Sequence, residues 1–325
     1  MKKYSHLSNE ERYFIHVSLR EGKTQKEIAQ SLNRDPSTIS REIRRGMWPR
    51  SIIYCYDWGV QFHRWRKQAR NRKRPSKLTA EIAVMIEALL KEFLSPQQIS
   101  NYLKIHHEIS ISHETIYQYI FSDSQRKKEF RPYFRQLHKN RRKKYGSGAR
   151  ASNIPNRVSI TERPAIVENK QRIGDWECDT VIGSDRKSVL VTLVERKTLF
   201  TVSKKLPRKT ALAVSQAIIT MLKPYKDLVH TLTFDNGSEF TKHERIAKAL
   251  EAETYFAHPY ASWERGLNEN TNGLLRQYFP KKTDFRTINW REIKYRVHQL
   301  NNRPRKTIGY RSPSELFLGE FNPLI

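Results

Sequence analysis

Three acidic residues in the C-terminal half occupy positions suited to metal-dependent phosphodiester chemistry. Asp179 lies in GDWECDTVIG at the end of the first predicted strand, Asp235 directly follows the strand HTLTF, and Glu269 lies inside a long predicted helix. Carboxylate oxygens are the hard ligands that Mg²⁺ prefers, and the ion keeps water and substrate phosphate in its other positions. Two such ions about 4 Å apart can activate the attacking oxygen and stabilise the leaving one. We therefore expect a two-ion Mg²⁺ site, which Mn²⁺ can also occupy.

The first of these acids is not singled out by its spacing. Asp175 and Glu177 precede Asp179 by four and two residues. Because side chains alternate between the two faces of a strand, all three would lie on one face. The strand pattern alone therefore leaves three candidates for this ligand.

The long helix carries a polar stripe around Glu269. Arg265, Glu269, Asn272 and Arg276 are spaced so that they fall on one helical face. Asn270, Asn272 and Gly273 are poor helix formers, and helix propensity gives no reason for their presence. We expect this face to support the glutamate or to position a DNA end, through Trp263, Arg265, Asn270, Asn272 and Arg276. Trp263 fits a core position equally well.

An α/β domain must position these acids. The hydrophobic pattern predicts strands near 173–182, 188–196, 199–206, 230–234 and 254–257, and helices near 209–222, 242–250 and 262–279. Strands alternating with helices in this order indicate a layered α/β fold with a mixed sheet. No nucleophile elbow, P-loop or Cys/His zinc spacing competes with the carboxylates.

The N-terminal region has the pattern of a helix-turn-helix. Residues 7–45 predict three short helices, with capping boxes at Ser8 and Thr24 and an Asp35-Pro36 start to the third. The third helix would bury two isoleucines and face outward with Ser37, Thr38, Ser40, Arg41, Arg44 and Arg45. Hydroxyls and arginines on the second helix of such a pair suit the major groove of DNA. An ordinary three-helix bundle with a solvated basic face is the alternative.

The charge of the chain favours a polyanionic partner. The formal net charge is +28, and residues 1–150 hold 32 Lys and Arg against 14 Asp and Glu. The segment 63–77 has no acid, and it would contact phosphates as a linker through Arg64, Arg66, Lys67, Arg70, Arg72, Lys73, Arg74 and Lys77. General solubility is the less specific reading of this excess.

These patterns divide the chain into five segments. We expect a helix-turn-helix DNA-binding domain at 1–62, a basic linker at 63–77, a second helical module at 78–121, a basic linker at 122–158 and the α/β catalytic domain at 159–325. The second module is either a second, weaker helix-turn-helix or a plain packing domain, because its exposed face is less basic.

Two cysteines, Cys55 and Cys178, cannot make a disulfide framework or a Cys-rich zinc site, and they suit a reducing cytosol. The chain has no run of about 18 apolar residues and no signal-peptide pattern. We therefore expect no membrane partner and a place in the bacterial cytosol with the nucleoid.

The motifs GDWECDTVIG, TFDNGSEF and HPYASWERGLNENTNGLLRQYFPK resemble those of the bacterial insertion-sequence-thirty family of transposases. The 33 residues between Asp235 and Glu269, the N-terminal helices and RSPSELF near the end extend the resemblance over the whole chain. It implies a ribonuclease-H-like fold, similar to the retroviral integrase core, and a D-D-E triad of Asp179, Asp235 and Glu269. The resemblance thus selects Asp179 among the three strand acids.

The resemblance also implies that the N-terminal region binds the terminal inverted repeats of a mobile element, and that the catalytic site cleaves and transfers double-stranded DNA. Bringing two ends together suggests a homodimer or a larger assembly. Two other functions remain open on the sequence. One is a sequence-specific repressor with an inert catalytic domain, and the other is a structure-specific endonuclease on the same fold.

Overall fold

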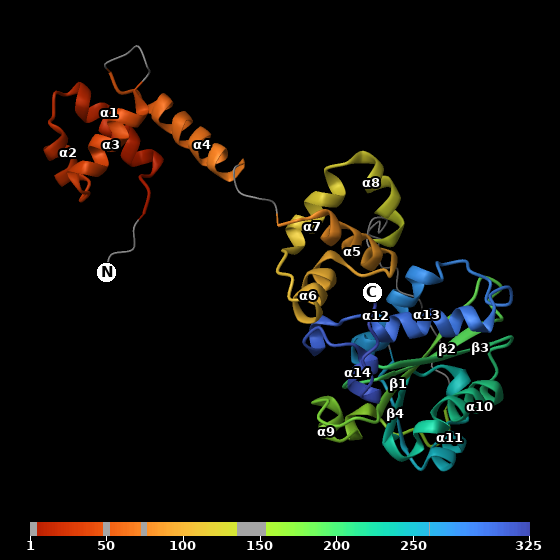
Figure 1. The fold of residues 1–325 in the computed structure, drawn as a ribbon. Helices are drawn as coiled ribbons and strands as arrows, with labels where there is room; N and C mark the ends of the chain where they lie inside the picture. Colours follow the sequence, from red (N-terminus) through yellow and green to blue (C-terminus); the bar gives the residue numbers. More distant parts are fainter. Residues whose placement is uncertain (1–4, 48–52, 73–76, 135–153, 260) are drawn as a thin grey trace. The chain divides into compact units, whose positions relative to one another are not determined.

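The computed structural model describes residues 5–47, 53–72, 77–134, 154–259 and 261–325. They form two compact units, residues 1–77 and residues 78–325, which are drawn in Figure 1 and described separately below.

The first unit is a small helical bundle made of α1 (Asn9–Arg20), α2 (Gln25–Ser31), α3 (Pro36–Gly46) and α4 (Tyr56–Arg72). The capping boxes predicted at Ser8 and Thr24 are present, and Asp35 caps α3 with Pro36 at its first position. Ile15, Ile28 and Ile39 are completely buried at the centre. The local signals therefore start each helix where the apolar residues can meet.

Helix α4 differs from the prediction, because residues 63–72 continue the helix and are not a linker. The segment contains Ala, Gln, Lys and Arg, which all favour helices, and its first proline comes only at position 75. Its charges therefore lie along a helix surface. Lys73 and Arg74 lie outside the described residues.

The second unit begins with a helical module, α5 (Ala80–Lys91), α6 (Pro96–His106), α7 (His113–Phe121) and α8 (Ser124–Phe130), followed by η1 (Arg131–Tyr133). Helix α8 lies in a segment that was predicted to be linker. The Asp123 side chain caps α8, and Phe130 at its end is fully buried in the module's core. These two features explain why the helical region extends past residue 121.

The module packs against the α/β domain. The Gln299 side chain donates to Glu92 at 2.6 Å, and the Leu324 amide donates to the Tyr102 hydroxyl at 2.9 Å. The Gln277 side chain donates to the Tyr133 carbonyl at 2.9 Å. The helical module and the α/β domain therefore form one compact unit.

The α/β domain has a five-stranded mixed sheet in the order β3-β2-β1-β4-β5. The strands are β1 (Asp175–Ile182), β2 (Val189–Glu195), β3 (Thr201–Leu206), β4 (Thr231–Phe234) and β5 (Glu253–Phe256). β1, β2 and β3 are antiparallel, whereas β4 lies parallel to both β1 and β5. The predicted mixed sheet is confirmed.

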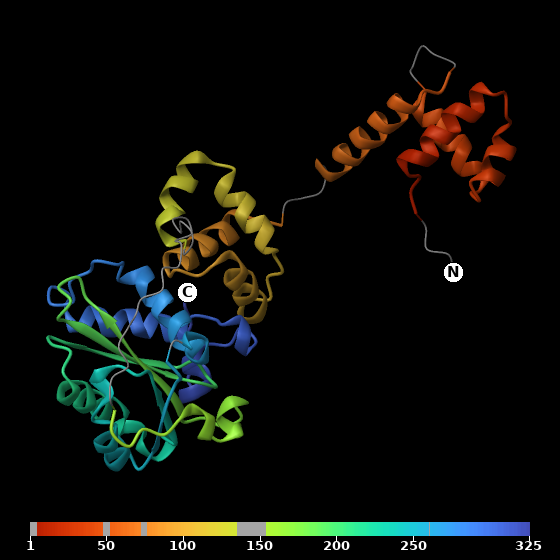
Figure 2. The same ribbon diagram turned by 180° about the vertical axis from the view of Figure 1, so that it is seen from behind.

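Helices cover both faces of this sheet, as Figures 1 and 2 show from opposite sides. One layer contains α10 (Ala211–Leu222) and α11 (His243–Leu250), and the other contains α12 (Gly266–Tyr278) and α13 (Trp290–Asn302). Short elements complete the domain: η2 (Ile160–Glu162), α9 (Ala165–Glu168), η3 (Lys223–Leu228), η4 (Ser238–Phe240), η5 (Ser262–Arg265), η6 (Lys306–Ile308) and α14 (Pro313–Leu318).

The alternation along β1 decides which acids face α12. Cys178 belongs to the core formed with α10 and α11, whereas Val181 belongs to the core formed with α12 and α13. Asp179 lies an even number of residues from Val181, so its side chain faces the α12 layer.

Among the described residues, no helix is long and apolar enough to span a bilayer.

Candidate active site and DNA-binding face

The two aspartates belong to neighbouring parallel strands, one within β1 and the other just after β4. Asp235 directly follows β4, as predicted. Asp179 is the fifth of the eight residues of β1, so the prediction that it ends the strand is wrong. The strand continues because Thr180, Val181 and Ile182 still pair with β2. Glu177 pairs with Thr233 between β1 and β4, and two further steps along this register bring Asp179 opposite Asp235.

Arg265 bridges the two carboxylates. Its Nη1 lies 3.6 Å from Asp179 Oδ1, and its Nη2 lies 3.2 Å from Asp235 Oδ2. Nη1 also donates to the Cys178 carbonyl at 3.3 Å, which fixes the guanidinium against β1. Both acids therefore converge on one cation.

Asn272, two turns further along α12, holds Asp179 from the other side. Its Nδ2 donates to Asp179 Oδ2 at 2.7 Å, and its Oδ1 accepts from the Thr192 hydroxyl at 3.2 Å. The Thr180 amide donates to Asp179 Oδ1 at 2.9 Å. Arg265 and Asn272, predicted to share one helical face, both contact Asp179.

The electrostatics of the site favour a bound cation. Burial raises the pKa of Asp179, and the nearby charges of Asp235 and Glu239 act in the same direction, whereas Arg265 lowers it. A buried carboxylate that is costly to ionise gains from any positive charge placed beside it. Two oxygen-donor side chains that already share one cation are a donor set that fits a divalent ion.

Glu269 is not joined to the two aspartates in this structure. It lies one helical turn after Arg265, and its side chain is exposed. Among the residues that the structure describes, no cluster of three or more His, Cys, Asp or Glu side chains is placed to hold a metal ion. The structure thus brings together two members of the predicted triad.

The other two acids of β1 are engaged in the fold. Asp175 pairs with Arg172 at 3.1 Å and accepts from the Thr231 hydroxyl at 2.8 Å. Glu177 forms an ion pair with buried Arg196. Among the ion pairs of the described residues, Asp179 is the acid of β1 that contacts Arg265, the arginine that also contacts Asp235.

Glu239 and Lys209 contact this site and were not predicted from the sequence. Glu239 is buried, accepts from the Thr180 hydroxyl at 2.9 Å and pairs with Lys209 Nζ at 2.6 Å. A Cβ on Gly237 would lie 2.4 Å from Glu239 Oε2 and 2.8 Å from Asp235 Oδ1. The motif TFDNGSEF carried this signal, since a glycine and a glutamate follow Asp235 at close spacing.

The remaining predicted support residues lie in three different surroundings. Arg276 donates to the Ile182 carbonyl at 3.0 Å, so it contacts the end of β1. Trp263 is 76% exposed, and a core position for it is wrong. Asn270 lines a cavity of about 290 Å³ between the helical module and the α/β domain. Arg276 thus contacts β1, Trp263 faces solvent and Asn270 faces the helical module.

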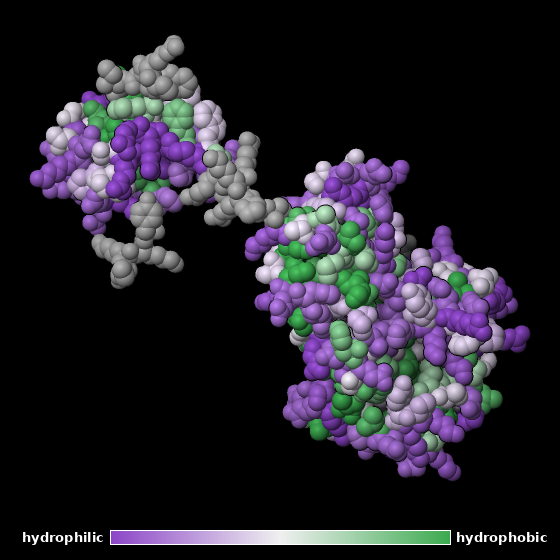
Figure 3. All heavy atoms as spheres, in the orientation of Figure 1, coloured by the Kyte–Doolittle hydropathy of each residue, from purple (hydrophilic) through white to green (hydrophobic). Residues whose placement is uncertain are grey.

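The third helix of the first unit presents the predicted polar face. Ile39 and Ile43 are buried, and Thr38 is half-buried. Of the other residues predicted to face outward, all are exposed: Ser37, Ser40, Arg41, Arg44 and Arg45. Hydrophilic residues cover much of the visible face of this unit in Figure 3.

Helix α4 adds basic residues to this unit. Arg64, Arg66 and Lys67 are exposed, and Arg66 donates to the Arg45 carbonyl at 3.0 Å, next to the end of α3. The side chains of Arg70 and Arg72 are not among the described ones. Buried Glu42 of α3 pairs with buried Arg12 of α1 at 2.7 Å, which fixes α3 against the bundle.

Comparison with known proteins gives a family match for the first unit and relatives over nearly the whole chain. Residues 3–46 match the family model of a helix-turn-helix domain. Over 96% of this chain and 95% of the relative, the sequence is 42% identical to the "Transposase for insertion sequence element IS4351" of Bacteroides fragilis. It is 35% identical to the "Transposase InsI for insertion sequence element IS30A" of Escherichia coli, over 96% of this chain and 83% of that protein.

A solved structure, the catalytic core domain of BIV integrase, is 24% identical and covers 44% of this chain and 93% of that one, with a TM-score of 0.35. A helix-turn-helix unit, in a chain that is similar to curated transposases over nearly its whole length, places this protein in the class of DNA-binding transposases. The chain belongs to the insertion-sequence-thirty family of transposases.

Proposed function

We propose that this protein cleaves DNA at the ends of an insertion sequence and transfers the freed 3′-hydroxyls to target DNA, using one metal-dependent site and no covalent protein–DNA intermediate. The observation that carries the proposal is the convergence of Asp179 and Asp235 on one cation, at distances of 3.6 and 3.2 Å from Arg265. Phosphoryl transfer depends mainly on positioning and charge neutralisation, and this site supplies both.

Asp179, Asp235 and Glu269 would hold the metal. Bound Mg²⁺, or Mn²⁺ in its place, would activate the attacking oxygen and neutralise charge on the leaving one. The chain itself orients the carboxylates: Asn272 and the Thr180 amide fix the two oxygens of Asp179. Arg265 supplies a positive charge that a DNA phosphate approaching the two aspartates would meet.

The N-terminal unit would bind the terminal inverted repeats, with Arg41 and Arg44 of α3 in the major groove and α4 along the phosphates. Exposed arginines on a helix that is fixed by a buried ion pair support this assignment. Synapsis of two ends would require a homodimer or a larger assembly, acting in the bacterial cytosol at the nucleoid.

Isosteric variants test the catalytic assignment. Asp179→Asn, Asp235→Asn and Glu269→Gln should each abolish cleavage of end-bearing DNA in Mg²⁺ and in Mn²⁺, while gel-shift binding of the same DNA persists. Asp227→Asn, which changes an exposed acid outside the site, is the matched control. Cleavage by any one of the three variants would remove that residue from the triad.

The products distinguish the other two functions. A wild-type protein that binds ends but forms no nicked or joined DNA with either metal would be a repressor. One that nicks DNA but never joins the cut end to a second duplex would be an endonuclease.

A further inference from the structure

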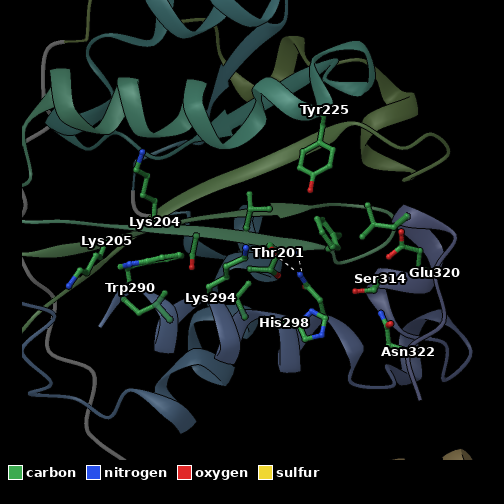
Figure 4. A pocket seen from close by; sticks show the side chains of 17 residues that line it. Thr201, Lys204, Lys205, Tyr225, Trp290, Lys294, His298, Ser314, Glu320 and Asn322 are labelled. Carbon is green, nitrogen blue, oxygen red and sulfur yellow. Dashed lines mark hydrogen bonds between the residues drawn. The ribbon is translucent and has the colours of Figure 1, made fainter. Parts of the chain in front are cut away.

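The edge of the sheet opens into a cleft on the side opposite to β5. Strand β3 is the last strand in the order β3-β2-β1-β4-β5, so only one of its sides is paired. A cavity of about 710 Å³ lies along its free side, between the two helical layers. Figure 4 shows Tyr225 on one side of the strand and Trp290 of α13 on the other. We call this cavity the edge cleft.

The main chain of β3 has hydrogen-bonding groups that point into the edge cleft. The Asn301 side chain accepts from the Thr201 amide at 2.9 Å and donates to the Thr201 carbonyl at 2.8 Å. The main-chain N–H and C=O of Thr201 therefore point away from β2. Main-chain groups of alternate residues point the same way in an antiparallel pair, so those of Ser203 and Lys205 also face outward. Within the described part of the chain, no partner is found for these amides and carbonyls, and the Ser203 hydroxyl is buried without one.

The walls of the edge cleft are apolar and its rim is basic. Val202, Ile293 and Val297 line its floor, and the Trp290 side chain is 58% exposed at its mouth. Lys204, Lys294 and one acid, Glu320, line it with exposed side chains, so lysines outnumber acids there. An unpaired strand edge beside apolar side chains is a template on which another chain can pair.

We propose that β3 accepts an extended acidic segment of a partner protein as an added strand. An extended peptide satisfies the outward amides and carbonyls of Ser203 and Lys205, and its alternate side chains enter the apolar cleft. The lysine rim selects acidic residues in the other positions. A second copy of this chain has a formal net charge of +28 and is a poor electrostatic match for that rim. DNA has no peptide N–H and C=O groups that could pair with a strand.

The test uses the full-length protein and a fluorescein-labelled peptide of alternating Glu and Val or Phe, about ten residues long so that it covers the six residues of β3. Fluorescence anisotropy should show binding that is at least about tenfold weaker for the same peptide with Lys in place of Glu. Equal binding of the acidic and basic peptides would overturn the proposal.

Main-chain methylation tests strand addition without changing the protein. Peptides N-methylated at alternate residues in one frame should lose about tenfold or more in affinity, because the blocked amides face β3, and those methylated in the other frame should bind normally. Identical behaviour of the two frames would exclude an added strand.

Protein variants locate the site. Trp290→Ala and Lys294→Glu should weaken the acidic peptide about tenfold, whereas Leu212→Ala and Lys248→Glu, which alter exposed residues outside the cleft, should not. DNA cleavage should be unchanged in all four, so failure of the proposed catalysis would be seen separately. Displacement of the peptide by duplex DNA would make the cleft a DNA surface. A dimer that the Trp290 variant dissociates would make it a self-association surface, and either result overturns the proposal.

Discussion

Replacing Arg265 by methionine removes the one cation that Asp179 and Asp235 share. The two carboxylates then repel each other, and among the described residues only neutral donors, the Asn272 side chain and the amides of Thr180 and Gly237, remain hydrogen-bonded to them. Loss of one partner from a fully buried ion pair costs about 3–5 kcal/mol, and an exposed pair is worth at most about 1 kcal/mol. The Asp179 and Asp235 side chains are 22% and 34% exposed and Arg265 is 14% exposed, so an intermediate cost of about 2 kcal/mol is expected. For a domain of this size that corresponds to roughly 4–8 °C in Tm.

The pH dependence of this loss has a definite sign. Burial already raises the pKa of Asp179, and Arg265 opposes this rise, so the variant should raise the pKa further. A raised pKa in the folded state destabilises the protein only where the carboxyl is ionised. The stability difference between variant and wild type should therefore vanish below the ordinary aspartate range and grow as the pH rises through the raised value.

Thermal unfolding of the metal-free full-length protein between pH 4 and pH 8, with and without Mn²⁺, measures this prediction. Without metal at neutral pH the variant should melt lower, and Mn²⁺ should stabilise it more than it stabilises wild type, because no arginine competes for the carboxylates. Arg286→Met, which removes an exposed arginine elsewhere in the same unit, is the control. Equal melting temperatures in the absence of metal, together with equal stabilisation by Mn²⁺, would refute the reasoning.

Three further predictions concern other parts of the molecule. Arg41→Ala and Arg44→Ala should each weaken binding to element ends, by about 1–3 kcal/mol where the arginine contacts a base, and equal losses on random DNA in a gel shift would mark phosphate contacts instead. Arg12→Met should destabilise the first unit by about 3–5 kcal/mol, because it leaves Glu42 charged and buried, and urea unfolding followed by tryptophan fluorescence would show no change if the pair were dispensable. Gly237→Ala should sharply reduce cleavage with little change in DNA binding, because its Cβ would meet a carboxylate oxygen at 2.4 Å, and normal cleavage rates would show that the loop relaxes freely.

The sequence predicted the elements whose signals are local. Helix starts at Ser8 and Thr24 were correct because a capping box involves only four consecutive residues. Asp235 was placed correctly because the strand before it is short and apolar. Helix α4 was misjudged because a run of arginines and lysines suits a solvated linker and an exposed helix equally well.

The site was harder to predict because its contacts join residues far apart in the sequence. Asp179 was placed at a strand end, whereas pairing with β2 extends the strand beyond it. Sequence periodicity placed Arg265 and Asn272 on one helical face, but it could not show that both side chains would contact Asp179. Glu239 and Lys209 were overlooked because a buried acid and its lysine have no periodic signature.

In the DNA-free protein, the Arg265 guanidinium occupies the two carboxylates that would bind a metal ion, so it competes with the ion. A DNA phosphate is the natural competitor for that guanidinium, and a phosphate that draws Arg265 away leaves two carboxylates without a counter-ion. Substrate and metal would then each raise the affinity of the protein for the other by the same factor, since such coupling is reciprocal. A protein with this arrangement would hold metal ions weakly until a DNA phosphate had displaced the arginine.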